Sequence, residues 1–168
     1  PVIERSVLTI AGSDSCGGAG AQADHNTFAA FGVYGASVIT AVTARNTLGV
    51  RAFEPVSDHL IVAQIEAVLE DLPVSAIKTG TLPSVAGIAI LGEILESQPR
   101  RLPLVVDPVV IQSEERALAG DTALEAIQNH LFPLATVITP NLEEARGLTG
   151  MEILDMEQME AAARELLS

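Results

Sequence analysis

The sequence predicts an α/β fold, in which helices pack on both faces of a mostly parallel β-sheet. Two observations support this prediction. Short apolar runs rich in β-branched residues alternate along the chain with longer stretches of helical periodicity. The first apolar run also ends on Gly12-Ser13-Asp14 and a later one on Asp107-Pro108, which is typical of a buried strand that enters a loop.

The first part of the chain contains a predicted strand–helix–strand unit. Residues 6–11 are a compact apolar run, and residues 35–44 are dense in β-branched residues, so both are expected to form buried strands. The helix between them covers residues 19–31 and is expected to stop at Gly32. The candidates for its buried face are Ala23, Phe28 and Phe31.

The later elements follow the same rhythm. Residues 51–55 are typical of a short edge strand, where Pro55 is tolerated, and Ser57 can cap a helix that runs to about residue 72. The later predicted strands are residues 74–78, 104–106 and 136–139. The later predicted helices are one capped by Ser84, one from Asp121 to about 131, a short one over 143–148, and one from Asp155 to 167 with Gln158 placed for a capping box.

Composition limits the classes of function. The 168 residues are 48% hydrophobic and 18% charged, so we expect one folded domain over residues 1–168 rather than a disordered acidic segment. Nine Lys and Arg against 22 Asp and Glu give a net charge of −13, which disfavours a nucleic-acid partner. No apolar run approaches the roughly 18 residues of a membrane span, residues 1–5 are not typical of a signal peptide, and one cysteine excludes an internal disulfide. The expected location is the cytoplasm.

Polar residues and glycines follow every strand of the predicted parallel sheet. Because ligands bind at the carboxyl ends of the strands in open α/β sheets, these positions predict one cleft. The alternative is that loops are polar in any protein. The residues concerned are Gly12, Asp14 and the loop 17–20 after the first strand, Arg45 and Asn46 after the second, Lys78 to Gly80 after the third, Asp107 after the fourth, and Thr139 and Asn141 after the fifth.

The glycine-rich loop at residues 17–20 precedes a predicted helix. It matches neither a Walker A motif nor the dinucleotide fingerprint, so it indicates either close approach of backbone to a small ligand or a tight strand-to-helix turn. Asp24 lies about one turn inside the helix, where its carboxylate can accept a hydrogen bond from a substrate hydroxyl. A solvated helix residue is the alternative.

Asn141 and Glu144 have the spacing of one helix face at the start of a predicted helix. Together with Asp107 they can hold Mg²⁺ through water. The same spacing also predicts a capping box without any metal, in which Asn141 is the N-cap and Glu144 the third helical residue.

Five segments of the chain, taken together, resemble one family. They are LTIAGSDSCGGAGAQAD (8–24), FGVYGASVITAVTARNTLGV (31–50), KTGTL (78–82), VVDPVV (105–110) and LFPLATVITPNLEEARGLTG (131–150). In this order they resemble the hydroxymethylpyrimidine/phosphomethylpyrimidine kinases of thiamine biosynthesis, a branch of the ribokinase-like superfamily related to pyridoxal kinases. The resemblance implies a three-layer sandwich with a mostly parallel central sheet.

The resemblance also implies an activity and a site. Such enzymes phosphorylate 4-amino-5-hydroxymethyl-2-methylpyrimidine and then its monophosphate, with ATP and Mg²⁺ as cofactors, and their dimers imply a homodimer here. The implied substrate positions are Gly12, Asp24, Arg45, Thr81 and Val109. The implied positions for magnesium and phosphate are Asp107, Asn141 and Glu144.

The sequence departs from the family pattern at several of these positions. Arg45 stands where the family commonly has glutamine, and Thr81 stands where it commonly has methionine. Residues 111–116 do not keep the usual flap lysine, and His25 and Asn26 replace Leu and Lys. The Gly-Thr-Gly-Cys segment of the family's C-terminal part, which carries its anion hole and proposed base, does not occur, so no catalytic base is identified. The alternative function is a non-catalytic protein that binds pyrimidine or pyridoxal.

Overall fold

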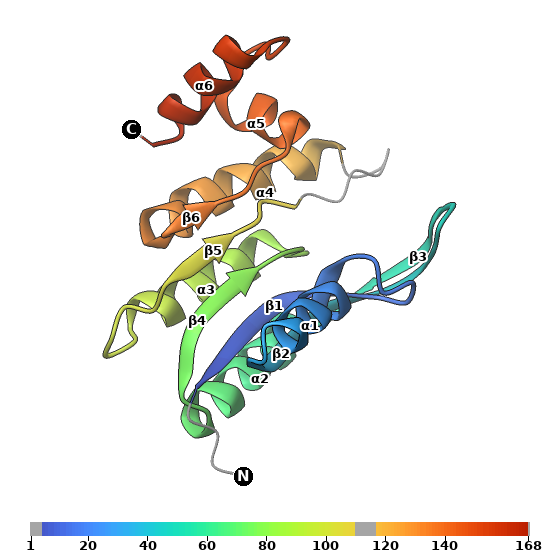
Figure 1. Ribbon diagram of the computed structural model, residues 1–168, viewed down its shortest axis with the longest axis vertical. Helices are drawn as coiled ribbons and strands as arrows, with labels where there is room; N and C mark the ends of the chain where they lie inside the picture. Colours follow the sequence, from blue (N-terminus) through green and yellow to red (C-terminus); the bar gives the residue numbers. More distant parts are fainter. Residues whose placement is uncertain (1–4, 110–116, 168) are drawn as a thin grey trace.

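The computed structural model describes residues 5–109 and 117–167, except the side chains of residues 117–121. Within these ranges a six-stranded sheet has the order β3-β2-β1-β4-β5-β6 (Figure 1). The strands are β1 (Ser6–Asp14), β2 (Tyr34–Asn46), β3 (Gly49–Pro55), β4 (Val74–Thr79), β5 (Leu104–Val106) and β6 (Val137–Ile138). All neighbours pair in parallel except β2 and β3, which form an antiparallel hairpin at one edge.

Helices lie on both faces of the sheet, which confirms the predicted three-layer α/β sandwich. The helices are α1 (Gly20–Ala30), α2 (Asp58–Asp71), α3 (Val85–Glu96), α4 (Ala117–His130), α5 (Leu142–Thr149) and α6 (Met156–Glu165), with a short 3-10 helix over Phe132–Leu134. In Figure 1, α1 crosses the near face over β1 and β2, whereas α2 and α3 lie behind the sheet. The orange and red helices α5 and α6 lie at the end of the molecule next to β6.

The main core lies between the sheet and the layer formed by α2, α3 and α4. Alternate residues of β1, Leu8 and Ile10, are fully buried in it, together with Ile88 of α3 and Ile127 of α4. The opposite face of β1 carries Thr9, which is also fully buried but lies toward α1. Because side chains alternate along a strand, β1 separates an apolar face for the core from a face that serves α1.

Some predicted boundaries were wrong, for local reasons. Strand β1 continues to Asp14 because its parallel pairing with β2 extends past Gly12 through a register shift. Phe31 is 81% exposed rather than buried, since α1 ends at Ala30 and Phe31 is its C-cap. Asp121 does not cap α4, which begins at Ala117. The side chain of Gln158 accepts from the backbone of Leu154 and not from Asp155, so the predicted reciprocal capping box of α6 is half formed.

Two serine N-caps allow one capping hydrogen bond to be tested. Ser84 Oγ accepts from the Gly87 amide at 2.8 Å and donates to Asp58 Oδ1 at 2.8 Å, whereas the N-cap Ser57 of α2 makes no side-chain capping bond. We expect Ser84→Ala to lower the free energy of unfolding by about 1 to 2 kcal/mol. The matched control Ser57→Ala should change it by less than about 0.5 kcal/mol. Urea unfolding of both variants checks this, and equal losses would contradict it.

The structure contains no candidate membrane helix within its described residues, since none of these helices is both long and apolar enough to cross a bilayer.

One edge of the sheet is β6, a strand of two residues whose Val137 is half exposed. An apolar groove of about 490 Å³ lies between this strand and the end of α6, lined by Val137, Ile138, Ala163 and Leu166 among others.

Candidate functional site

A cavity of about 540 Å³ lies at the carboxyl ends of the central strands. It brings together Gly12 near the end of β1, Arg45 near the end of β2, Thr81 after β4 and Val109 after β5. These are four of the five substrate positions implied by the family resemblance, although they are scattered over almost a hundred residues of sequence. The predicted cleft is therefore present where the topology of a parallel sheet places it.

The lining of the cavity combines apolar and polar residues. Val50, Ala52 and Phe53 of β3 and Val109 supply an apolar wall, which suits the faces of a flat ring. The polar residues of the lining are Ser13, Asp14, Thr43, Arg45, Arg51 and Thr81. The loop that carries Thr81 is fixed by Thr40 Oγ1, which donates to the Thr81 carbonyl at 2.6 Å. A cavity of this size with both kinds of surface is typical of a small-molecule site.

Asp14 organises the loop between β1 and α1. Its two carboxylate oxygens accept from the backbone amides of Cys16 at 2.9 Å and Ala19 at 3.0 Å, and its side chain is buried. Gly20 then starts α1 with φ of +58°, and a Cβ atom at this position would overlap the carbonyl of Gly12. This close approach brings the start of α1 to the cavity wall, so the glycine loop both makes a tight turn and lines the site.

Asp24 does not line this cavity. Its carboxylate points to the sheet, where it accepts from Thr9 Oγ1 at 2.5 Å and lies 3.1 Å from the ammonium of Lys78. The Lys78 Nζ atom is also 3.8 Å from Asp107 Oδ2, and Asp107 Oδ1 accepts from Thr139 Oγ1 at 3.1 Å. We call these five residues the Lys78 network.

The Lys78 network connects α1 with the ends of β4, β5 and β6, beside the cavity. It contains two carboxylates and one ammonium, and the exposed fractions of the three side chains are 14% for Asp24, 27% for Lys78 and 29% for Asp107. The pairs are therefore partly desolvated, which strengthens them relative to surface pairs. With one more negative than positive group, the network can accept a hydrogen bond from a hydroxyl or attract a cation.

Asn141 and Glu144 form the capping box of α5. Asn141 Oδ1 accepts from the amides of Glu143 at 2.9 Å and Glu144 at 3.0 Å, and Glu144 Oε2 accepts from the Asn141 amide at 2.8 Å. The structural reading of this spacing is thus confirmed. Burial raises the pKa of the Glu144 carboxyl, and the nearby charges of Asp107 and Glu143 raise it further, while the hydrogen bond from Asn141 lowers it.

The chemistry of these residues fits a magnesium ion bound through water. Asp107 is close enough for its charge to raise the pKa of Glu144, and Glu144 Oε1 has no hydrogen bond among those of the described residues. Oxygen ligands from one or two carboxylates are what Mg²⁺ uses beside phosphates. The described part of the chain holds no group of three His, Cys, Asp or Glu side chains that would form an all-protein metal cage.

Two residues of the site, Thr9 and Arg51, were not predicted from the sequence. Lys78 was expected in the cleft, but its contact with two carboxylates depends on the fold. Thr9 and Arg51 gave no signal, because their roles depend on which face of a strand they occupy. Residues 111–116, whose missing flap lysine was noted above, lie outside the described residues.

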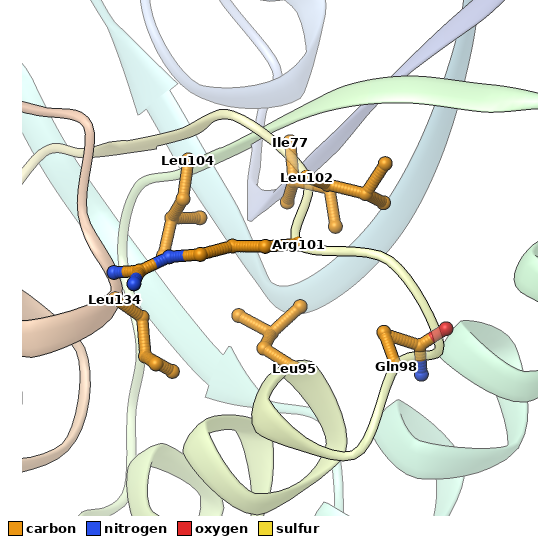
Figure 2. Close-up of a pocket in the computed structure, with 7 residues that line it drawn as sticks. All are labelled: Ile77, Leu95, Gln98, Arg101, Leu102, Leu104 and Leu134. Atoms are coloured by element: carbon orange, nitrogen blue, oxygen red, sulfur yellow. The ribbon is translucent and has the colours of Figure 1, made fainter.

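A second cavity, at the amino-terminal end of β5, is too small for a ring ligand (Figure 2). Its volume is about 20 Å³, which is enough for about one water. Figure 2 shows Arg101 extended between Leu104 and Leu95, and its guanidinium donates to the Pro133 carbonyl at 2.6 Å. We assign it a packing role.

Comparison with solved structures defines the class of the protein. A crystal structure of phosphomethylpyrimidine kinase from Clostridium difficile 630 is 46% identical, with a TM-score of 0.86, covering 96% of this chain and 72% of that chain. Pyridoxal kinase from Staphylococcus aureus, in complex with AMP-PCP and pyridoxal, is 36% identical, with a TM-score of 0.83, covering 99% of this chain and 59% of that chain. The fold is thus that of the ribokinase-like small-molecule kinases.

Sequence comparisons identify the family within this class. A family model described as phosphomethylpyrimidine kinase matches residues 14–168. Hydroxymethylpyrimidine/phosphomethylpyrimidine kinase of Mycobacterium bovis is 46% identical over 160 residues, which cover 95% of this chain and 58% of the relative. The chain belongs to the phosphomethylpyrimidine kinase family, as the motifs predicted, and it spans about 58% of the length of the curated relatives it matches.

Proposed function

We propose that the protein takes part in the ATP-dependent phosphorylation of 4-amino-5-hydroxymethyl-2-methylpyrimidine and of its monophosphate. The observation that carries this proposal is the position of the ring-sized cavity directly beside the Lys78 network at the carboxyl ends of the strands. Phosphoryl transfer needs a positioned hydroxyl and charge stabilisation more than covalent chemistry. The cavity offers the first, and the network can attract the cation that supplies the second.

In this proposal each part of the site has one role. The apolar wall formed by Val50, Phe53 and Val109 holds the ring, and the Asp24 carboxylate orients the hydroxymethyl group by accepting its hydrogen bond. Asp107 and Glu144 hold magnesium through water, with Asn141 fixing the Glu144 side chain through the capping box. Magnesium, when bound with ATP, supplies positive charge to the phosphate oxygens.

The proposal predicts a large effect of neutralising Asp24. Because the described residues do not include the family's anion hole, transfer is measured with this chain fused to the C-terminal segment that the family resemblance implies, taken from the Mycobacterium bovis relative. We expect the fusion to phosphorylate the pyrimidine, and Asp24→Asn to lower kcat/KM roughly 100-fold. A coupled ADP-release assay is the measurement.

Asp71→Asn, an exposed aspartate at the end of α2, is the matched control and should keep full activity. Lack of any turnover by a folded fusion would rule out the kinase function.

Two further predictions remain. The family resemblance predicts a homodimer, and the composition predicts a location in the cytoplasm.

A second candidate function is binding of a pyrimidine or pyridoxal ring without transfer. It is favoured by the cavity, whose lining includes none of the residues proposed for magnesium, Asp107, Asn141 and Glu144. Calorimetric titration with the pyrimidine and with pyridoxal, without ATP, tests this candidate. Failure of both rings to bind would reject it.

A further inference from the structure

Two arginines lie side by side in the wall of the ring cavity. Arg45 ends β2, and Arg51 lies on β3 of the same hairpin. In the pairing of β2 with β3, Ala44 lies opposite Ala52 and Arg45 lies opposite Val50. Arg51 therefore has no residue opposite it on β2 and forms a bulge. A bulge of this kind redirects a side chain, and here both guanidinium groups belong to the lining of one cavity.

The backbone of Arg45 is fixed, whereas neither guanidinium has a partner among the described residues. Ser15 Oγ accepts from the Arg45 amide and donates to the Arg45 carbonyl, both at 2.8 Å. None of the ion pairs among the described residues includes Arg45 or Arg51, and none of the side-chain hydrogen bonds found there uses their guanidinium groups. Within the described part of the chain, both cations are therefore available to a ligand.

Among the described residues, no carboxylate of the cavity wall is free to neutralise these charges. Asp14 is the acidic residue of the lining, and both of its oxygens accept backbone amides of the glycine loop. Asp24 and Asp107, which belong to the Lys78 network, do not line the cavity. Both arginine residues are exposed, so an anionic ligand in the cavity can reach their guanidinium groups and form charge-assisted hydrogen bonds with them.

We propose that Arg45 and Arg51 bind an oxyanion carried by the substrate ring, a carboxylate or a phosphate. This inference rests on the proposed function, because it takes the cavity as the ring site. A planar guanidinium binds such an oxyanion through two parallel hydrogen bonds and has no acceptor of its own. The preferred substrate is therefore an anionic hydroxymethyl-substituted pyrimidine or pyridine, rather than the neutral ring that a glutamine at position 45 would suit.

The test compares two rings that differ in one substituent. 4-Pyridoxate carries a carboxylate where pyridoxine carries a neutral hydroxymethyl group, and both are titrated calorimetrically into the 168-residue chain at low ionic strength. We expect 4-pyridoxate to bind at least about tenfold more tightly. Arg45→Gln and Arg51→Gln should each reduce this preference severalfold, and the double variant should remove it. Arg164→Gln, on the surface of α6, is the matched control and should leave it unchanged.

Each outcome decides the inference. The inference would be overturned if the two rings bound with equal affinity or if neither bound. It would also be overturned if the preference survived in a double variant whose circular dichroism spectrum is unchanged. Tighter binding of the pyrimidine monophosphate than of 4-pyridoxate, lost in the same variants, would support it and identify the anion as phosphate. Phosphoryl transfer by the fusion without any anion preference would keep the proposed function but reject this inference. An anion preference without phosphoryl transfer would keep this inference but reject the proposed function.

Discussion

Gly20→Ala is expected to destabilise the protein by about 3 kcal/mol or more. Gly20 adopts φ of +58°, a left-handed conformation that costs an L-residue roughly 1 to 2 kcal/mol. A Cβ atom at this position would also overlap the carbonyl oxygen of Gly12, and such overpacking adds about 1 to 3 kcal/mol. The midpoint of urea unfolding should fall accordingly, and ring binding should weaken because the cavity wall moves.

Gly18→Ala is the matched control for this prediction. Gly18 lies two residues away in the same loop, has nothing within 4 Å of an added Cβ, and is not in the left-handed region. We expect the free energy of unfolding of the Gly18→Ala variant to differ from that of the parent protein by less than about 0.5 kcal/mol. If both alanines were tolerated equally, the tight contact between Gly20 and Gly12 would not exist in solution.

Lys78→Met is expected to cost about 2 kcal/mol of stability. The substitution keeps most of the apolar volume but leaves the carboxylates of Asp24 and Asp107 without their shared cation. Breaking a fully buried pair costs about 3 to 5 kcal/mol, and the partial exposure of these side chains reduces that figure through solvent screening. Urea unfolding with a common slope for all variants is the measurement.

A double-mutant cycle separates the ion pair from general packing. When Lys78→Met and Asp24→Asn are combined, no charge remains at either position, and the side-chain amide introduced by Asp24→Asn can still accept from Thr9. We expect the double variant to lose roughly 1 kcal/mol less than the sum of the two single losses. Strictly additive losses would show that Lys78 stabilises the site by packing alone.

Much of the fold could be predicted because its signals are local. The predicted bounds of the strand at 104–106 agree with those of β5, and the predicted cap Ser84 accepts the amide of Gly87. The errors came from competing local signals. Asp121 is a good N-cap residue, but the Ala-Leu-Ala run that precedes it has high helix propensity, and α4 begins there.

The site could be predicted only in part. Strand ends of a parallel sheet meet at one edge, so the meeting of Gly12, Arg45 and Val109 followed from topology and from the family motifs. The direction in which each side chain points could not be predicted in this way. Asp24 lies toward Thr9 and Lys78 rather than in the cavity, a placement that depends on the phase of α1 over the sheet. Arg51 enters the cavity through a bulge, which strand patterns do not reveal.

The solitary lysine gives the protein an unusual chemical property. Lys78 carries the only side-chain amine of the chain, and about a quarter of this side chain is accessible between two carboxylates. An acylating reagent directed at lysine can therefore label one side-chain atom, at the junction of three strands and a helix. The extent of acylation at this atom therefore reports how accessible the Lys78 network is, without any engineered tag.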